Sequence, residues 1–330
     1  MKSVIAGGSL AGLMAGLELR AAGLPVSIHE RSERVLDDRG AGIVMQPETQ
    51  QVLIKRCGLR QEETGVWLQY RQYLGKDGTL EFHKAMPQLM TSWGLLYRAM
   101  RAAFLAEDYV EGDALLSFKS TKRKVTCHFA KSGEVECDLL ETFADHFTFQ
   151  QMRRSHILCY LIPGANGETE PGARRLNWVW YWNVAEAALP DFMTGRDARV
   201  RDFSVPPGQM REELVEQQGA IAEEMFCPQF FHLWKATKDP FAQPILDLAV
   251  PRMRHERIAV VGDAAFIPRP HTAASTSKAA ANAIALGEAL VRRRLDIDAA
   301  LKEWEPRQLD LGRRLEAQGI MLGNRSQFSD

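Results

Sequence analysis

A glycine-rich turn between a short strand and a helix opens the chain and constrains its fold more than any other feature. Residues 3–6 form an apolar run, and residues 10–22 show the spacing of an amphipathic helix. Gly7 and Gly12 match the first and last positions of a G-x-G-x-x-G pattern between these segments. A second apolar run at residues 25–29 completes a strand, a helix and a strand, which together predict a βαβ unit.

The turn of this unit predicts a binding site for the pyrophosphate of a dinucleotide. In such units the first backbone N–H groups of the helix and the positive end of its dipole face the ligand. Ser9 stands where the middle glycine is expected, which is the smallest possible departure from the pattern. The candidate contacts are Gly7, Ser9, Leu10, Ala11 and Gly12. The alternative is a Rossmann-like unit that holds no nucleotide.

Glu30 ends the second strand of the unit and is the expected partner of a ribose. A carboxylate in this position accepts hydrogen bonds from both ribose hydroxyls, and such charge-assisted bonds are strong. Glu30→Ala is therefore expected to weaken dinucleotide retention in part.

A second strand end, near the C-terminus, predicts the other half of the site. Residues 257–261 read as a buried strand, and Gly262-Asp263 follow it directly. The carboxylate of Asp263 supplies another acceptor for sugar hydroxyls. Because apolar side chains of the strand would do the packing, Asp263→Ala is expected to impair cofactor binding more than folding.

These two motifs, with the segments between them, resemble the FAD-dependent aromatic hydroxylases, which are group A flavoprotein monooxygenases with a p-hydroxybenzoate hydroxylase-like fold. Arg39-Gly40-Ala41-Gly42-Ile43 resembles the family loop that runs beside the flavin. The segment from Trp93 to Arg101 resembles the helix whose arginine reaches the flavin ribityl chain and phosphate. Within the family, the 2,6-dihydroxypyridine hydroxylase branch is the most similar. An NAD-dependent dehydrogenase is disfavoured, because Gly262-Asp263 belongs to a two-part FAD site.

The resemblance implies further contacts to FAD. The role of the family arginine falls on Arg98, for which a solvated helix arginine is the alternative. The segment from Pro268 to Ala283 resembles a glycine-rich turn and helix that face the flavin pyrimidine ring, although Ala273 and Ser275 replace the two glycines and Asn282 replaces an aspartate. The remaining residues implied to bind FAD are Arg31, Arg39, Gly42, Pro270, Ala273, Ala274, Ser275 and Ser277.

One family element is absent. Family members carry Gly-Ala-Asp-Gly after the strand that residues 136–140 begin, whereas here the sequence passes directly into Glu141 and the second domain. The sole Asp-Gly pair, Asp77-Gly78, is a hairpin signal. Two explanations are open. Either the protein has an internal deletion of several tens of residues after Leu140, or this sequence omits a stretch that the real protein has. A flavin-binding protein with impaired or no hydroxylase activity is thus the alternative function.

The substrate end is expected at an aromatic strand. Residues 177–183 place three tryptophans on one face and Tyr181 on the other. Core packing is the alternative for each tryptophan. Tyr181 and His271 are the catalytic candidates, since either could assist deprotonation of a substrate hydroxyl. A loop histidine with an ordinary structural role is the equal alternative for His271.

Composition excludes several classes. The net charge of −1 with scattered basic residues argues against nucleic-acid binding. Five cysteines show no metal spacing, and no metal site is expected. No secretory signal and no membrane-length apolar run is visible, so a cytoplasmic protein without a membrane partner is expected.

The sequence thus predicts an α/β fold in which a Rossmann-like FAD-binding domain is interleaved with a mixed-sheet substrate domain and followed by a C-terminal helix. The expected FAD-binding domain comprises residues 1–66, 84–140 and 250–330, and the substrate domain comprises residues 67–83 and 141–249. The resemblance implies that an electron-rich aromatic ring is hydroxylated with O2 and NADH or NADPH, through a flavin C4a-hydroperoxide. A homodimer is left open.

Overall fold

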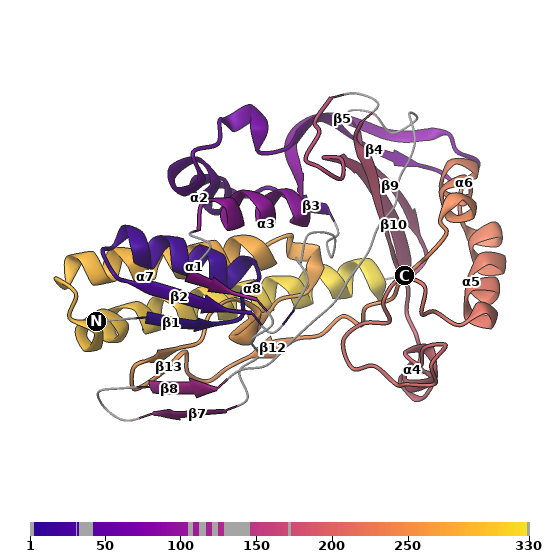
Figure 1. Cartoon of the computed structure of the whole chain (residues 1–330). Helices are drawn as coiled ribbons and strands as arrows, with labels where there is room; N and C mark the ends of the chain where they lie inside the picture. Colours follow the sequence, from indigo (N-terminus) through magenta and orange to yellow (C-terminus); the bar gives the residue numbers. More distant parts are fainter. Residues whose placement is uncertain are drawn as a thin grey trace.

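Two sheets of different kinds organise the protein (Figure 1). The structure is a computed structural model, and it describes residues 3–30, 32, 42–104, 108–111, 117–120, 125–128, 146–170 and 173–328. The expected α/β architecture, with a Rossmann-like half, a mixed-sheet half and a long C-terminal helix, is confirmed.

The first sheet is parallel and belongs to the nucleotide half. Its order is β1-β2-β6, formed by Ser3–Ala6, Val26–His29 and Tyr109–Val110. Helix α1 (Leu10–Ala21) joins β1 to β2, as the βαβ prediction requires. Helix α1 packs against α7 (Ser275–Arg292), so the first and last parts of the chain share one core. Figure 1 shows these two helices lying over β1 and β2.

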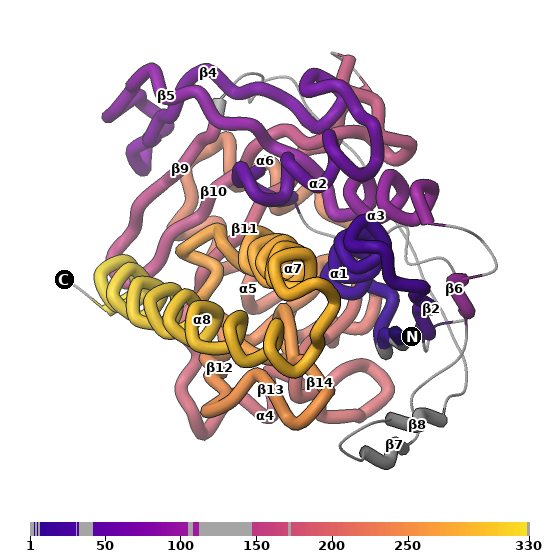
Figure 2. The backbone as a smooth tube through the Cα atoms, turned by 90° about the vertical axis from the view of Figure 1, so that its left-hand side faces the viewer, coloured from indigo at the N-terminus to yellow at the C-terminus, as the bar shows by residue number. Residues whose placement is uncertain are grey.

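Three further helices complete this half: α2 (Pro47–Cys57), α3 (Trp93–Ala102) and α8 (Ile297–Gln327). Pro47 begins α2 and Gly58 ends it with a φ of 71°, positions that backbone geometry favours for these two residue types. Figure 2 shows α8 running beside α7 and reaching the sheet of the other half with its C-terminal end.

The second sheet is six-stranded and mixed, with the order β11-β10-β9-β4-β5-β3. Only the β4 and β9 pair is parallel. The strands are β3 (Gly42–Val44), β4 (Val66–Leu74), β5 (Leu80–Ser92), β9 (His146–Met152), β10 (Ser155–Ile162) and β11 (Arg175–Tyr181). Helices α5 (Glu212–Met225) and α6 (Pro228–Ala236) lie against one face of this sheet (Figure 1).

Strand β5 changes one expected boundary. It runs without a break from Leu80 to Ser92 and pairs with both β4 and β3. The expected division at residue 83 therefore falls inside a strand. The sequence did not show this, because alternating polarity in a hairpin does not reveal how far its second strand continues. The strand carries the chain from the outer end of the mixed sheet directly into α3.

The remaining elements of the described chain are short. They are η1 (Gln61–Glu63), β7 (Ser117–Ser120), β8 (Val125–His128), η4 (Glu186–Ala188), α4 (Leu189–Phe192), β12 (Leu248–Ala249), β13 (Arg254–His255), β14 (Ile258–Ala259), η5 (Gly262–Ala264), β15 (Phe266–Ile267) and η6 (Pro270–Thr272). The strand expected at residues 257–261 is only β14, which is half-buried and pairs with β13. Among the described strands β1 pairs with β2 alone, so β14 does not extend the parallel sheet.

The two faces of β11 serve different purposes. Trp178 and Trp180 pack with Phe226 and Phe230 of the α5 and α6 layer, which confirms the packing interpretation for these tryptophans. The opposite face carries Tyr181 and lies towards the nucleotide half. None of the helices described is both long and apolar enough to cross a lipid bilayer.

Candidate active site

The glycine turn after β1 has the geometry of a phosphate-binding turn. Gly7 adopts a φ of 107°, a conformation that side chains rarely allow, and a Cβ on Gly12 would collide with the carbonyl oxygen of Gly7. Ser9 precedes α1 with extended backbone, is exposed, and makes no capping bond through its side chain. Helix α1 begins at Leu10, so its first N–H groups, those of Leu10 and Ala11 among them, are available to an anion.

Glu30 lies against this turn. Its Oε2 accepts from the backbone N–H of Gly8 at 2.7 Å, and its Oε1 accepts from that of Ser32 at 2.8 Å. Tyr109 donates its hydroxyl to the carbonyl oxygen of Gly8 at 2.9 Å, a contact that sequence analysis missed. The carboxylate thus shapes the turn, and each oxygen keeps a second lone pair for a ribose hydroxyl.

The two distant motifs meet at this turn, as the sequence predicted. A Cβ on Gly262 would lie 2.8 Å from the Cβ of Ala11, so η5 touches the first turn of α1. The N–H of Gly262 donates to Oδ1 of Asn282 at 3.0 Å, which ties η5 to α7. Gly262 leaves room for this close approach, and its φ of 65° is a conformation that glycine adopts readily.

Asp263 has a buried partner that the sequence did not reveal. Its Oδ1 accepts from Nζ of Lys278 at 2.7 Å, and the same Nζ donates to the carbonyl oxygen of Phe266. The Lys278 side chain is 1% exposed, whereas that of Asp263 is 66% exposed. Burial lowers the pKa of Lys278, and the charge of Asp263 and its hydrogen bond oppose this effect. The carboxylate is thus held at the surface by a lysine beneath it.

The loop before α7 forms a turn in which alanine and serine stand at the positions expected for the two glycines. Ala273 closes η6, which begins at Pro270, with a φ of 52°. Ala274 then precedes α7, Ser275 is its first residue, and Ser277 donates its hydroxyl to the carbonyl oxygen of Ala274 at 3.1 Å. The turn therefore holds an alanine in the left-handed region, where glycine is favoured.

Two predicted cofactor residues, Gly42 of β3 and Arg98 of α3, contact residues of the mixed-sheet half. The N–H of Gly42 donates to Oδ1 of Asn177 at 2.9 Å, and a Cβ there would meet the ring of Tyr160. Arg98 lies on α3 beside Gly167, where a Cβ would be 3.8 Å from its Nη2. The pKa of Glu168 is lowered mainly by hydrogen bonding to Asn166, and the charge of Arg98 adds to this.

The predicted contacts of Gly42 and Arg98 with FAD stay predictions. Arg31 and Arg39, and the segment around Leu140, lie outside the described residues.

The two catalytic candidates come together across the halves. Tyr181 ends β11, His271 lies in η6, and their ring centroids are 4.8 Å apart. Both ring nitrogens of His271 are buried, yet neither has a hydrogen-bond partner within the described part of the chain. Burial and the charge of Arg269 lower its pKa to about 4, against the opposing charge of Asp247. Burial raises the pKa of Tyr181 to about 12.

His156 joins this pair and was missed by sequence analysis. It stands opposite Tyr181 in the register of β10 and β11, and the two rings stack with centroids 4.3 Å apart. Its ring centroid is 5.8 Å from that of His271. Within the apolar β10 segment it had no pattern to mark it. We call His156, Tyr181 and His271 the aromatic triplet.

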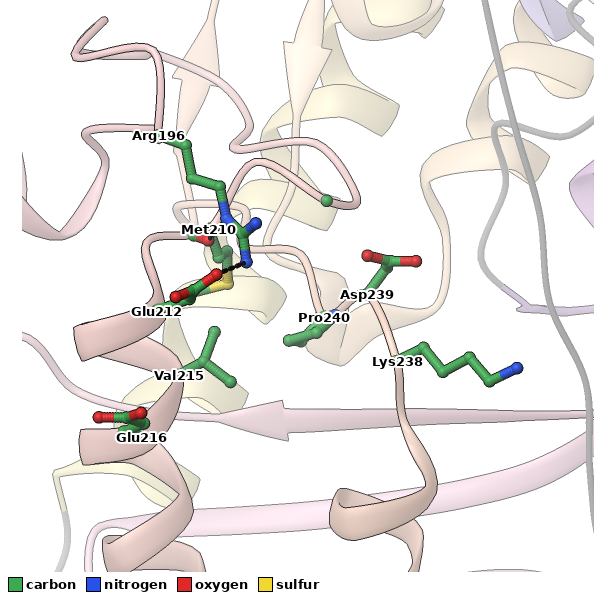
Figure 3. A pocket seen from close by; sticks show the side chains of 9 residues that line it. Arg196, Met210, Glu212, Val215, Glu216, Lys238, Asp239 and Pro240 are labelled. Atoms are coloured by element: carbon green, nitrogen blue, oxygen red, sulfur yellow. Dashed lines mark hydrogen bonds and ion pairs between the residues drawn. The ribbon is translucent and has the colours of Figure 1, made fainter.

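A separate pocket lies beside the first turns of α5 (Figure 3). Its lining residues are Arg196, Gly208, Met210, Glu212, Val215, Glu216, Lys238, Asp239 and Pro240. Arg196 forms an ion pair with Glu212 at 3.2 Å and donates to the carbonyl oxygen of Met210 at 2.9 Å. None of these residues belongs to the aromatic triplet or the glycine turn, so we assign it no role.

The residues present fit FAD. The glycine turn leaves no room for a Cβ on Gly12, the first N–H groups of α1 are available, and two carboxylates, Glu30 and Asp263, flank them. The unpartnered nitrogens of His271 lie on the side of the mixed sheet that meets this half.

Comparison with known proteins agrees with an FAD-binding protein. Residues 130–247 match the family model described as FAD binding domain-like. The chain is 30% identical to 2,6-dihydroxypyridine 3-monooxygenase of Paenarthrobacter nicotinovorans, over 93% of this chain and 87% of the relative. That alignment extends over 352 residues, more than the 330 of this chain, so part of the relative has no counterpart here.

Two solved structures are similar to the whole fold. The structure of 2,6-dihydroxypyridine-3-hydroxylase from Arthrobacter nicotinovorans has a TM-score of 0.87 and 28% identity, covering 99% of this chain and 92% of that one. Klebsiella pneumoniae HpxO, complexed with FAD and uric acid, has a TM-score of 0.75 at 15% identity, with coverages of 100% and 90%. The latter is a likeness of fold.

Proposed function

The chain belongs to the FAD-dependent aromatic monooxygenases, and from this premise we propose that it hydroxylates an electron-rich heteroaromatic ring such as a dihydroxypyridine. FAD is the cofactor, and NAD(P)H is the reducing co-substrate typical of the family. The relative at 30% identity is named for its action on 2,6-dihydroxypyridine, which supports this choice of ring.

The observation that carries the proposal is the aromatic triplet. A ring with two oxygen substituents needs flat apolar surfaces above it and polar atoms at its edge. Tyr181 and His156 supply stacked rings, and His271 supplies two buried nitrogens with no partner among the described residues. Buried polar atoms are rarely left unpaired, so a polar ligand is the natural partner.

The residues proposed to hold FAD follow from the two motifs. The N–H groups at the start of α1 bind the pyrophosphate, Glu30 the ribose, and Asp263 the ribityl chain, while Arg98 and the turn before α7 reach the isoalloxazine end. When bound, FAD supplies the redox chemistry, in which a hydride from NAD(P)H and O2 together place one oxygen atom on the ring. The division into FAD-binding and substrate domains is proposed as stated above, with β5 in the mixed sheet.

His271 is the proposed base. With a pKa near 4 it is neutral at neutral pH, so a ring nitrogen can accept the proton of a substrate hydroxyl. Loss of that proton leaves negative charge on the substrate oxygen and makes the ring more electron-rich. The negative charge of the substrate oxygen stabilises the protonated ring of His271 beside it, and this attraction offsets the low pKa of His271. Tyr181 orients the ring by stacking and through its hydroxyl.

The test supplies FAD-loaded protein with 2,6-dihydroxypyridine, 18O-labelled O2 and either NADH or NADPH. We expect the substrate to stimulate NAD(P)H oxidation and one labelled oxygen to enter the product. His271→Asn should lower kcat/KM by about 100-fold, whereas His255→Asn, on exposed β13, should leave it unchanged. If this ring neither stimulates NAD(P)H oxidation nor yields a labelled product, the proposed substrate is refuted.

A further inference from the structure

His156 has a partner that fixes its protonation. Gln327, the last residue of α8, is 4% exposed and places its Nε2 2.8 Å from Nδ1 of His156. The carbonyl oxygen of Gln327 accepts from Nδ2 of Asn183 at 2.8 Å, which anchors the helix end beside β11. The C-terminal helix therefore reaches the aromatic triplet through one side chain.

The direction of this hydrogen bond determines the tautomer of His156. An amide nitrogen donates and cannot accept, so Nδ1 of His156 is the acceptor and carries no proton. A neutral imidazole then has its proton on Nε2. Burial, and to a smaller extent His271, lower the pKa of His156 to about 4, so this neutral form is present at neutral pH.

The protonated nitrogen points away from Gln327, because the two nitrogens lie on opposite sides of the ring. Nε2 has no hydrogen-bond partner among the residues that the structure describes. His156 as a whole is 6% exposed, but its Nε2 is not fully buried. The N–H is thus available to a ligand within the aromatic triplet.

We propose that Gln327 holds His156 as the Nε2–H tautomer, and that this N–H donates to an oxygen substituent of the aromatic substrate. The inference rests on the proposed function and deepens it. His271 accepts the proton of one hydroxyl, while His156 donates to a second oxygen, so the site selects rings with two oxygen substituents over rings with one. Gln327 is a positioning residue, because it acts through His156.

The tautomer can be tested without substrate. The FAD-loaded protein is labelled with 15N-histidine, and the signals of His156 are assigned by their loss in His156→Phe. We expect a protonated Nε2 and an unprotonated Nδ1 at neutral pH. A proton on Nδ1 would overturn the inference, whatever ring the enzyme uses, so this result is separate from the fate of the proposed function.

The role of Gln327 can be tested by reversing the hydrogen bond. An ionised carboxylate only accepts, so Gln327→Glu should draw the proton to Nδ1 and turn the lone pair of Nε2 towards the substrate. The control is Asn324→Asp, which adds the same charge one turn earlier, where Oδ1 accepts from Arg269. Binding is measured without O2 or NAD(P)H, from the change in FAD absorbance on titration with 2,6-dihydroxypyridine or 2-hydroxypyridine.

Gln327→Glu should bind 2,6-dihydroxypyridine about 10- to 100-fold more weakly, with a smaller loss for 2-hydroxypyridine, while Asn324→Asp stays within about twofold of the parent. Equal affinities for parent and Gln327→Glu, or equal losses in both variants, would overturn the inference. A parent that binds neither ring refutes the proposed substrate, and the tautomer measurement then decides the assignment of His156 independently.

Substitutions of His156 itself separate donation from packing. Phenylalanine keeps a ring against Tyr181 but has no N–H, whereas glutamine places an amide N–H near the position of Nε2. We expect His156→Gln to retain binding within a few-fold and His156→Phe to lose about 10- to 100-fold. If phenylalanine binds as well as histidine, the residue only packs. Parent-like FAD content in both variants shows that they fold.

Discussion

Asp263→Ala should lower the stability of the FAD-free protein as well as its affinity for FAD. Sequence alone predicts nearly coincident melts for the two apo-proteins, because the apolar strand would do the packing. The structure instead gives Asp263 a second role, since it is the carboxylate partner of Lys278, which is 1% exposed. Removing Asp263 leaves a buried ammonium group whose remaining hydrogen-bond acceptor, among the described residues, is the carbonyl oxygen of Phe266.

The size of the loss follows from burial. Breaking a fully buried ion pair costs about 3–5 kcal/mol. The Asp263 side chain is 66% exposed, and solvent screens its charge, so we expect about 1–2 kcal/mol. Lys278→Met removes the buried charge at similar volume and should be nearly neutral. In that background Asp263→Ala should cost less than about 0.5 kcal/mol.

Urea unfolding of the four apo-proteins forms a double-mutant cycle that measures the coupling directly. Coupling of about 1–2 kcal/mol supports the pair. An equal cost of Asp263→Ala with and without Lys278 would refute the reasoning. The pH dependence provides a check, because the lowered pKa of Lys278 means that the unfolded chain binds more protons between that pKa and about 10.4. Stability from this group therefore rises with pH across that window, and Lys278→Met should remove the rise.

Four further predictions concern the turn before α7, the adenosine end of FAD, the two buried histidines and the segment after Leu140. Ala273→Gly should raise the unfolding free energy by about 0.5 kcal/mol in urea unfolding, because relief at a φ of 52° outweighs the entropy that glycine loses, and a fall would contradict this. Glu30→Ala should weaken FAD binding about 10- to 100-fold in equilibrium titration, and an unchanged affinity would mean that the adenosine does not bind at Glu30. His156 and His271 should titrate near pH 4, so stability is complete above about pH 6.5 and is lost as pH falls towards 4, a trend that His156→Phe should weaken in acid unfolding. If the segment after Leu140 is truly absent, NAD(P)H oxidation should yield mainly peroxide, and restoring a family-like segment should couple it to hydroxylation; tight coupling in the 330-residue chain would show that the segment is dispensable.

The local elements were predictable because their signals are local. The strand, turn and helix around Gly7 and Gly12 appear within a few residues of their expected limits. Pro47 and Gly58 mark α2 by backbone rules that need no tertiary contact. The meeting of Ala11 with Gly262 followed from resemblance, since spacing alone does not relate residues so far apart in sequence.

Contacts between distant segments were not predictable from pattern. Tyr181 and His271 were each proposed from their own motif, but only the fold shows that their rings meet. His156 lies in an apolar strand and Gln327 in a long helix, and neither residue type is unusual there. Their hydrogen bond depends on where α8 ends against the mixed sheet, which no periodicity determines.

One departure from the family pattern, Asn282, ties η5 to both α7 and α8. Asn282 stands where the family has aspartate, and it uses both ends of its amide. Its Oδ1 accepts from the N–H of Gly262, which an aspartate could also do, but its Nδ2 donates to Oε1 of Gln308 at 2.9 Å. Both side chains are buried, and two carbonyl-type oxygens facing each other there would be costly. An aspartate at 282 therefore requires a donor from residue 308, which Gln308 can supply by turning its amide.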